Sequence, residues 1–166
     1  MLCPAGFTGD GDGACRKKGK WMRDYVHRFY RRWMQASGLL SCRVTIKESD
    51  LFIWAQRDVS EEARASLAWH RGELEDFIAM QPLFAETFLP YEVPADAPEI
   101  VRLMAAAGKR AGVGPMSAVA GAIAELVGRD LIPLSPEVIV ENGGDIYLHS
   151  ARERRIGVFA GDSPLS

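Results

Sequence analysis

The sequence predicts an α+β domain in which an antiparallel sheet carries helices on one face. Three observations predict it. Apolar and polar residues alternate over 40–47, apolar residues recur at helical spacing between 58 and 131, and short apolar runs return after Pro136. The expected order of elements is β-β-α-α-α-β-β-β. Strands grouped at both ends of a helical block favour this arrangement over alternating βαβ units.

The first two strands are expected over 40–47 and 51–55, with a turn at 48–50. The first has the strict alternation of a half-buried strand, whereas Leu51-Phe52-Ile53-Trp54-Ala55 is apolar almost throughout and is expected to be more buried. Because only a short turn separates the two strands, we expect them to pair with each other.

Three helices should follow, each with a start signal. These signals are the pairs Asp58/Glu61 and Asp96/Glu99, which have capping-box spacing, and the Gly114-Pro115 step. The first helix is expected to stop at Pro82 and the second at Gly112. The three prolines between 82 and 94 predict an irregular, packed connector.

Strands are expected again over 138–140, 145–148 and 156–159. Glu141-Asn142-Gly143-Gly144 should form the hairpin turn between the first two, because asparagine and glycine accept positive φ at little cost.

Composition and charge exclude several classes of protein. The chain has 166 residues, of which 48% are hydrophobic and 25% charged, so wholesale disorder is excluded. A net charge of −2 argues against a histone-like or strongly membrane-attracted protein. No signal peptide is visible, and Cys3, Cys15 and Cys42 lack the spacing of a zinc site. We therefore expect reduced thiols, a cytoplasmic location and no membrane partner.

One candidate binding segment is 112–121, where glycines and small residues surround a predicted helix start. Free backbone N–H groups and the positive end of the helix dipole can hold an anion there, and glycines let a phosphate approach. The alternative, which we favour from this segment alone, is close packing of a small-residue helix on the sheet. His27, His70 and His149 share no triad or metal-ligand spacing, so no nucleophile is identified.

A second candidate is the bend at 141–145, where an acid, an amide and a second acid surround two glycines. Glu141 and Asp145 can hold Mg²⁺ or a ribose hydroxyl, and the Gly143 and Gly144 N–H groups can meet a phosphate. The alternative is a plain hairpin turn, for which one glycine would suffice.

The basic and aromatic segment 16–33 is a third candidate, with eight basic residues and one acid. Such interleaving can bind single-stranded nucleic acid through phosphate contacts and stacking. We favour a solvated edge strand with a basic lead-in, so nucleic acid is not the expected partner.

Several short runs of the sequence, taken together and in this order, indicate a resemblance to a known family. They are Glu48-Ser49-Asp50-Leu51, Arg71 with Leu74-Glu75, Pro82-x-Phe84, Ala97-Pro98, Gly112-Val113-Gly114-Pro115-Met116 with Ala120-Gly121, and Val140-Glu141-Asn142-Gly143-Gly144-Asp145-Ile146. Over about residues 25–166 the chain resembles the uncharacterised ApbE-like family, cytoplasmic relatives of the ApbE flavin transferases. The resemblance implies a T-fold-like architecture, homo-oligomers that extend sheets edge to edge, and a flavin, FAD or FMN, bound with magnesium.

The resemblance places the ligand between the glycine-rich helix start and the double-glycine bend. The implied cofactor-binding residues are Gly112, Gly114, Met116, Ser117, Asn142, Gly143, Gly144 and Asp145, with Asp145 also as the magnesium ligand. Flavin transfer itself is not expected, because Met116 and Gly121 stand where the transferases carry a lysine and an aspartate. Two alternative functions are a non-catalytic oligomeric accessory protein of a sulfur-assimilation pathway and the binding of single-stranded nucleic acid through 16–33.

The resemblance also implies how the chain is divided and where it works. Residues 1–22 are expected to form a disordered leader and 23–166 an ApbE-like domain that is shorter than family members at its C-terminus. The family is associated with homocysteine formation in sulfur assimilation. Cys42 is then either a sulfur carrier or a small buried hydrophobe.

Overall fold

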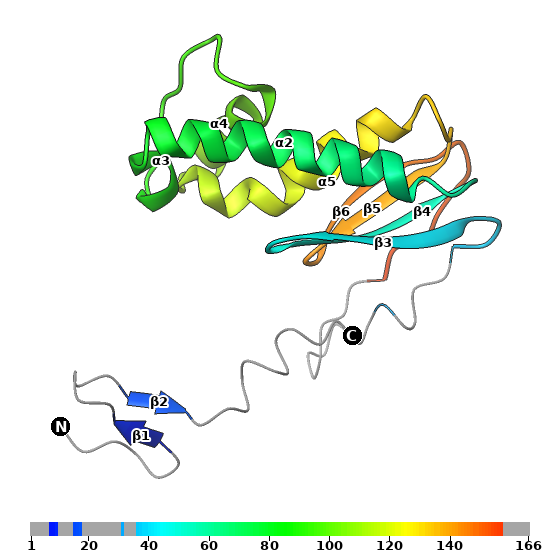
Figure 1. Cartoon of the computed structure of the whole chain (residues 1–166), viewed down its shortest axis with the longest axis horizontal. Coiled ribbons are helices and arrows are strands. Elements are labelled where there is room, and N and C mark those ends of the chain that lie inside the picture. The colour runs from blue at the N-terminus through cyan, green and yellow to red at the C-terminus, as the bar shows by residue number, and fades with distance from the viewer. Residues whose placement is uncertain (1–6, 10–14, 18–30, 32–35, 158–166) are drawn as a thin grey trace. The chain divides into compact units, whose positions relative to one another are not determined.

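The computed structural model describes residues 7–9, 15–17, 31 and 36–157 (Figure 1). The chain divides into two units, 36–157 and the remainder, and each is described by itself. In the remainder, β1 (Phe7–Gly9) pairs antiparallel with β2 (Cys15–Lys17). The predicted boundary between leader and domain stays a prediction.

The larger unit contains one four-stranded antiparallel sheet. Its strands are β3 (Leu40–Ile46), β4 (Ser49–Ala55), β5 (Val138–Asn142) and β6 (Asp145–His149), and they lie in that order across the sheet. The two hairpins, separated by some eighty residues of chain, meet where β4 pairs with β5, with Ile53 opposite Val140. The predicted α+β class with an antiparallel sheet is confirmed.

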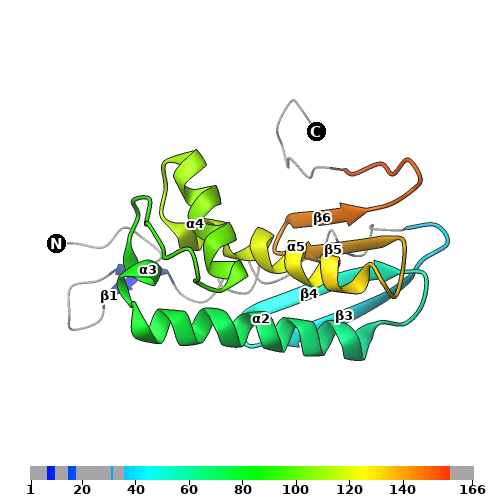
Figure 2. The same cartoon turned by 90° about the horizontal axis from the view of Figure 1, so that it is seen from above.

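The helices lie between the hairpins in the sequence and over one face of the sheet in space (Figures 1 and 2). They are α2 (Ser60–Met80), α3 (Leu83–Glu86), α4 (Glu99–Ala111), the 3₁₀ helix η2 (Pro115–Ala118) and α5 (Val119–Leu131). Helix α2 buries Ala63, Leu67, His70, Leu74 and Phe77, a stripe at helical spacing. Figure 2 shows α2 beside α5, both running along the sheet.

The core lies between this helix layer and the sheet. Val44, Leu51, Ile53 and Val140 are fully buried on the sheet's helix side, and Leu67 and Val127 are fully buried on the helices above them. The alternation read in the first strand is therefore what turns Val44 inward and leaves Arg43 and Thr45 exposed. Removing these side chains from water supplies the main stabilisation of the unit.

Several local expectations need correction. The first hairpin turns at Lys47-Glu48, with Lys47 at φ 51°, so Ser49 and Asp50 belong to β4. Asp58 does not cap α2; Val59 precedes the helix, and the Asp58 carboxylate accepts the Ser60 N–H at 3.0 Å.

Further differences concern the later elements. Pro98, not Asp96, precedes α4. The connector after Pro82 contains the short helix α3, and the third predicted helix begins as the 3₁₀ turn η2. Of the strand expected over 156–159, Ile156 and Gly157 are irregular and the rest lies outside the described residues.

Among the residues that the structure describes, no single helix is long and apolar enough to cross a membrane. One bent pair, α4 with Pro115–Leu131 at 106°, passes that test of length and composition.

Candidate functional site

The bend between β5 and β6 is a two-residue turn made by Gly143 and Gly144. Their φ angles are 67° and 107°, both in the region that favours glycine. A two-residue turn with positive φ at both central positions matches the right-handed twist of the flanking strands. The second glycine therefore has a structural reason, contrary to the expectation that one would suffice.

The strand register separates the two acids of the bend. Asn142 pairs with Asp145, and Glu141 pairs with Ile146. Because successive side chains of a strand point to opposite faces, Asn142 and Asp145 share the helix side of the sheet and Glu141 points to the other side. Glu141 is fully buried, and its Oε1 accepts the Gly144 N–H at 2.8 Å. The suggestion that Glu141 and Asp145 hold one Mg²⁺ together is therefore wrong.

The helix side of the bend is seated on the first turn of α5. The Asn142 side-chain amide donates to the Ala120 carbonyl oxygen at 3.1 Å, and Asn142 is almost fully buried. The Asp145 carboxylate lies against Gly121, since a Cβ at position 121 would be 3.9 Å from Asp145 Cγ and Oδ2. Gly121 and Asp145 are thus neighbours, although 24 residues of sequence separate them.

The residues before α5, from Gly112 to Ser117, have different neighbours. Gly112 ends α4 in the left-handed conformation, as expected, and its N–H reaches the Gly108 and Lys109 carbonyls. Gly114 is buried against the Thr87 backbone, and its carbonyl accepts both the N–H and the hydroxyl of Ser117. Met116 packs on the core.

The predicted ligand residues therefore fall into two groups, one around the start of η2 packed against Thr87 and one at the bend packed against α5, and they do not form two walls of one crevice. Gly114 faces Thr87, whereas Asn142 and Asp145 meet Ala120 and Gly121 about two turns further on. The exposed members of the set are Gly112, Ser117, Gly143, Gly144 and Asp145.

Two hollows in the described unit lie away from the bend. One, of about 520 Å³, is lined by Leu39–Cys42 together with Arg57, Asp58 and Ser60. The other, of about 230 Å³, lies between 91–95 and the face of α4 that carries Arg102 and Lys109. The Cys42 thiol belongs to the first hollow, and its pKa is raised by burial and by the nearby Asp58 charge.

A metal ion would find a single carboxylate at the bend. Within residues 36–157 and the other described positions, no three His, Cys, Asp or Glu side chains gather as a metal site. Mg²⁺ commonly binds one or two carboxylates and takes its other ligands from water and substrate phosphates. Asp145 therefore fits a magnesium ion that arrives with a phosphate ligand, not one bound by protein alone.

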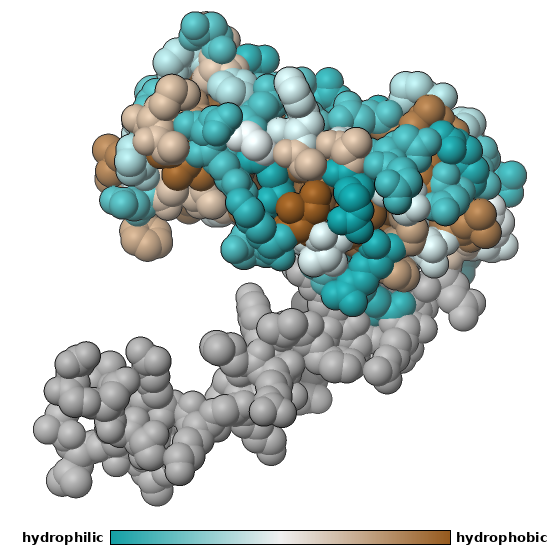
Figure 3. Space-filling model, viewed as in Figure 1, coloured by the Kyte–Doolittle hydropathy of each residue, from teal (hydrophilic) through white to brown (hydrophobic). Residues whose placement is uncertain are grey.

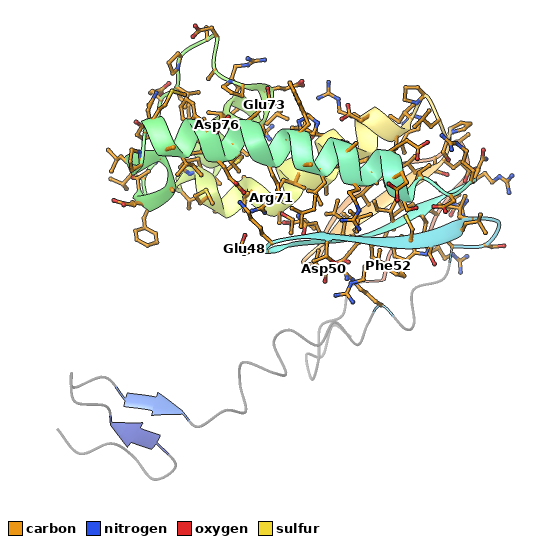
Figure 4. The ribbon with its side chains drawn as sticks, in the orientation of Figure 1. Glu48, Asp50, Phe52, Arg71, Glu73 and Asp76 are labelled. Carbon is orange, nitrogen blue, oxygen red and sulfur yellow. The ribbon has the colours of Figure 1, made fainter. Side chains whose placement is uncertain are left out.

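Sequence reasoning missed a polar cluster between the first hairpin and α2 (Figure 4). The Arg71 guanidinium donates to Ser49 Oγ at 2.7 Å, Glu48 Oε2 at 3.0 Å and Glu75 Oε1 at 2.7 Å. A hydrogen bond from Lys47 lowers the pKa of Glu75, and burial opposes that shift. The i,i+4 spacing of Arg71 and Glu75 was the available signal. Because Arg71 on α2 donates hydrogen bonds to Glu48 and Ser49 of the first hairpin, the cluster holds α2 against that hairpin.

The remaining sequence candidates play other parts. His70 is buried between α2 and α5, with Nε2 2.9 Å from Asp130 Oδ2, which also accepts the Ser66 hydroxyl. The basic segment 16–33 falls almost entirely outside the described residues. His27 does so too, and His149 is exposed on β6.

Comparison with known proteins finds one family model and several relatives that match this chain. A family model described as AbpE bacteria matches residues 31–166. The UPF0280 protein of Methanocaldococcus jannaschii is 42% identical over 125 residues, which are 75% of this chain and 50% of that protein. The UPF0280 protein of Methanococcoides burtonii is 47% identical over 106 residues, 63% of this chain and 45% of the relative. That of Methanocella arvoryzae is 49% identical over 96 residues, 57% and 39%. The chain thus spans half or less of these relatives.

Proposed function

The chain belongs to the family described as AbpE bacteria, and we propose that it binds a phosphate-bearing small molecule together with magnesium at the bend between β5 and β6. FAD and FMN are the first candidates, because of the resemblance to the ApbE-like family. The observation that carries the proposal is the seating of the bend on α5, which holds the Asp145 carboxylate beside Gly121 at the start of a helix.

Charge decides how a phosphate can bind here. The helix start attracts an anion by about 0.3–1 kcal/mol. Asp145 already lies at this place, and two like charges about 4 Å apart near a protein surface repel by about 4 kcal/mol. The repulsion outweighs the attraction, so a phosphate binds beside Asp145 only with a cation between them. Magnesium supplies that cation and neutralises the phosphate charge.

In this proposal the residues at the bend have different roles. Asp145 holds the magnesium ion, and Asn142 positions the bend through Ala120. Gly143, Gly144 and Ser117 are exposed, so a ligand can approach them, although the Gly144 N–H already donates to Glu141 Oε1. Binding, not flavin transfer, is the proposed activity, because Met116 and Gly121 offer neither an amine nor a carboxylate.

Calorimetric titration of the full chain tests the proposal. FAD and FMN, each with and without magnesium chloride, are compared with riboflavin, which has no phosphate. We expect FAD or FMN to bind with magnesium, and to lose most of that affinity in EDTA. Absence of binding at millimolar ligand, equal binding of riboflavin, or binding indifferent to magnesium would overturn it.

A further inference from the structure

Four large apolar side chains gather at the end of α2 and around α3. They are Met80, Leu83, Phe88 and Leu89, which are 73%, 58%, 91% and 71% exposed. We call these four residues the α3 patch. Hydrophobic residues gather at this end of α2 in the space-filling view (Figure 3). Single exposed apolar residues are ordinary, whereas four within ten residues of chain form a group of the kind that marks an interaction site.

The patch is carried on a fixed base. The Thr87 N–H donates to the Leu83 carbonyl at 3.0 Å, and the Leu89 N–H donates to Thr87 Oγ1 at 3.1 Å. Gly114 packs directly against the backbone of Thr87 and Phe88. The backbone that carries Phe88 is therefore already ordered before a partner covers the side chain.

The layer beneath the patch is also packed. Phe84 is fully buried there, and its ring meets those of Phe77 and Tyr91 edge to face, with centroids 5.2 and 5.7 Å apart. Burial of Phe84 and exposure of Phe88 thus place one aromatic ring in the core and the other in water. Folding of this chain does not use the second ring.

The size of the patch suits a small interface. With about 200 Å² for each large apolar side chain, the exposed fractions leave about 500–600 Å² of apolar surface. That is the largest patch expected on a monomer, and two such patches together reach the roughly 1,000 Å² that a specific interface needs.

The charge around the patch favours a like surface over a membrane or nucleic acid. Residues 80–90 contain one charged side chain, Glu86, in a chain that is 25% charged. Glu73 and Asp76 precede the patch on α2 (Figure 4). Residues 80–90 hold no lysine or arginine that could attract an anionic lipid or nucleic acid, whereas two copies related by a two-fold axis bring together faces that are mostly neutral and apolar.

We propose that the α3 patch is a two-fold interface between two copies of this chain, with Phe88 as its central contact. The interface uses none of the exposed residues of the proposed ligand site. Loss of dimerisation and loss of ligand binding are therefore separable results.

Sedimentation of the full chain over a concentration series tests the interface. We expect a reversible dimer, and we expect Phe88→Asp to raise its dissociation constant about tenfold or more. Trp69→Asp is the matched control: Trp69 is 66% exposed on the same helix, about 16 Å before Met80. It should leave the constant within about twofold, since it lies outside the patch. Circular dichroism checks that both variants fold, and Leu89→Asp serves as a second disrupting variant.

Photo-cross-linking identifies the contacting surface. Benzoylphenylalanine at position 88 is placed in a mixture of ¹⁴N- and ¹⁵N-labelled chains, and we expect mixed-isotope products joined within residues 80–89 of the second copy. A wild-type chain that stays monomeric at hundreds of micromolar, a dimer that Phe88→Asp leaves intact, or cross-links to another surface overturns the proposal. Phe88-dependent binding to lipid vesicles by a monomeric chain would overturn it in favour of a membrane.

Discussion

Gly114 and Thr87 meet backbone to backbone. A Cβ carbon at position 114 would lie 1.9 Å from the Thr87 carbonyl oxygen and 3.1 Å from Phe88 Cα. No rotation of a side chain can relieve such a contact, because both neighbours are main-chain atoms. The glycine is therefore required for the start of η2 to pack against the end of α3.

Replacing Gly114 by alanine should destabilise the fold. Overpacking of this kind costs about 1–3 kcal/mol, and a backbone neighbour puts Gly114→Ala at about the upper end. Thermal and urea unfolding measure the change. The matched control is Gly72→Ala in α2, where a Cβ meets nothing within 4 Å and should add about 0.5–1 kcal/mol of stability. Equal stability of the two variants would contradict the packing assigned to Gly114.

Asp145→Asn should separate ligand binding from folding. Asp145 is exposed, so the amide should leave the melting temperature within a degree or two while removing the charge that holds magnesium. We expect magnesium-dependent FMN binding to fall at least about tenfold by calorimetry. Unchanged binding in Asp145→Asn would show that the carboxylate is not a ligand.

Asn142→Leu tests the seat of the bend. The leucine removes the 3.1 Å hydrogen bond to the Ala120 carbonyl and leaves that carbonyl without the amide. We expect a stability loss of about 1–2 kcal/mol, and weaker FMN binding although Asp145 is intact. Asn142→Leu that binds FMN normally would show that the bend keeps its place by other contacts.

Local signals predicted the local structure well. Gly112 ends α4 as predicted, and the hairpin turn predicted at 141–144 is confirmed at Gly143-Gly144, with Glu141 and Asn142 in β5 instead. Glycine marks such positions because it accepts positive φ at little cost. The two capping-box predictions are wrong. Val59 and Pro98 directly precede α2 and α4, and neither helix has a side-chain cap. The membership of an uncharacterised family was also predicted correctly.

The candidate site was harder to predict, because its neighbours are distant in sequence. No local pattern says that Thr87 will cover Gly114, or that Asp145 will lie against Gly121. Strand alternation, by contrast, could have shown that Glu141 and Asp145 point to opposite faces once the turn was placed at Gly143-Gly144. The T-fold, the kinship with flavin transferases and the role in sulfur assimilation stay predictions.

Glu137 and Arg154 should make stability depend on acid pH. The Glu137 side chain is 5% exposed, forms an ion pair with Arg154, and lies 3.1 Å from Arg152 Nε. Its pKa is lowered by the hydrogen bond from Arg154. A lowered folded pKa gives stability that is present above the unfolded value, about 4.3, and is lost as the pH falls through the folded value.

Thermal unfolding from pH 7 to pH 3 tests this linkage. The wild-type chain should melt higher than Glu137→Gln at pH 7, and the two should converge as the pH falls below about 4. Arg152→Ala is the control, because its side chain is 71% exposed and exposed pairs contribute at most about 1 kcal/mol. A gap between wild type and Glu137→Gln that stays constant down to pH 3 would contradict the assigned ion pair.

Cys42 should be a slow thiol in the folded chain. Burial and the Asp58 charge raise its pKa, while a backbone hydrogen bond from Val59 lowers it less, so the reactive thiolate is scarce at pH 7.5. Alkylation by iodoacetamide, followed on the Cys42 peptide by mass spectrometry, should be slower in the folded chain than in urea. Asp58→Asn keeps an acceptor for the Ser60 N–H and removes the charge, so it should speed alkylation of folded Cys42. A sulfur carrier needs a ready thiolate, and a folded-state rate equal to or above that in urea would favour that role over the buried hydrophobe.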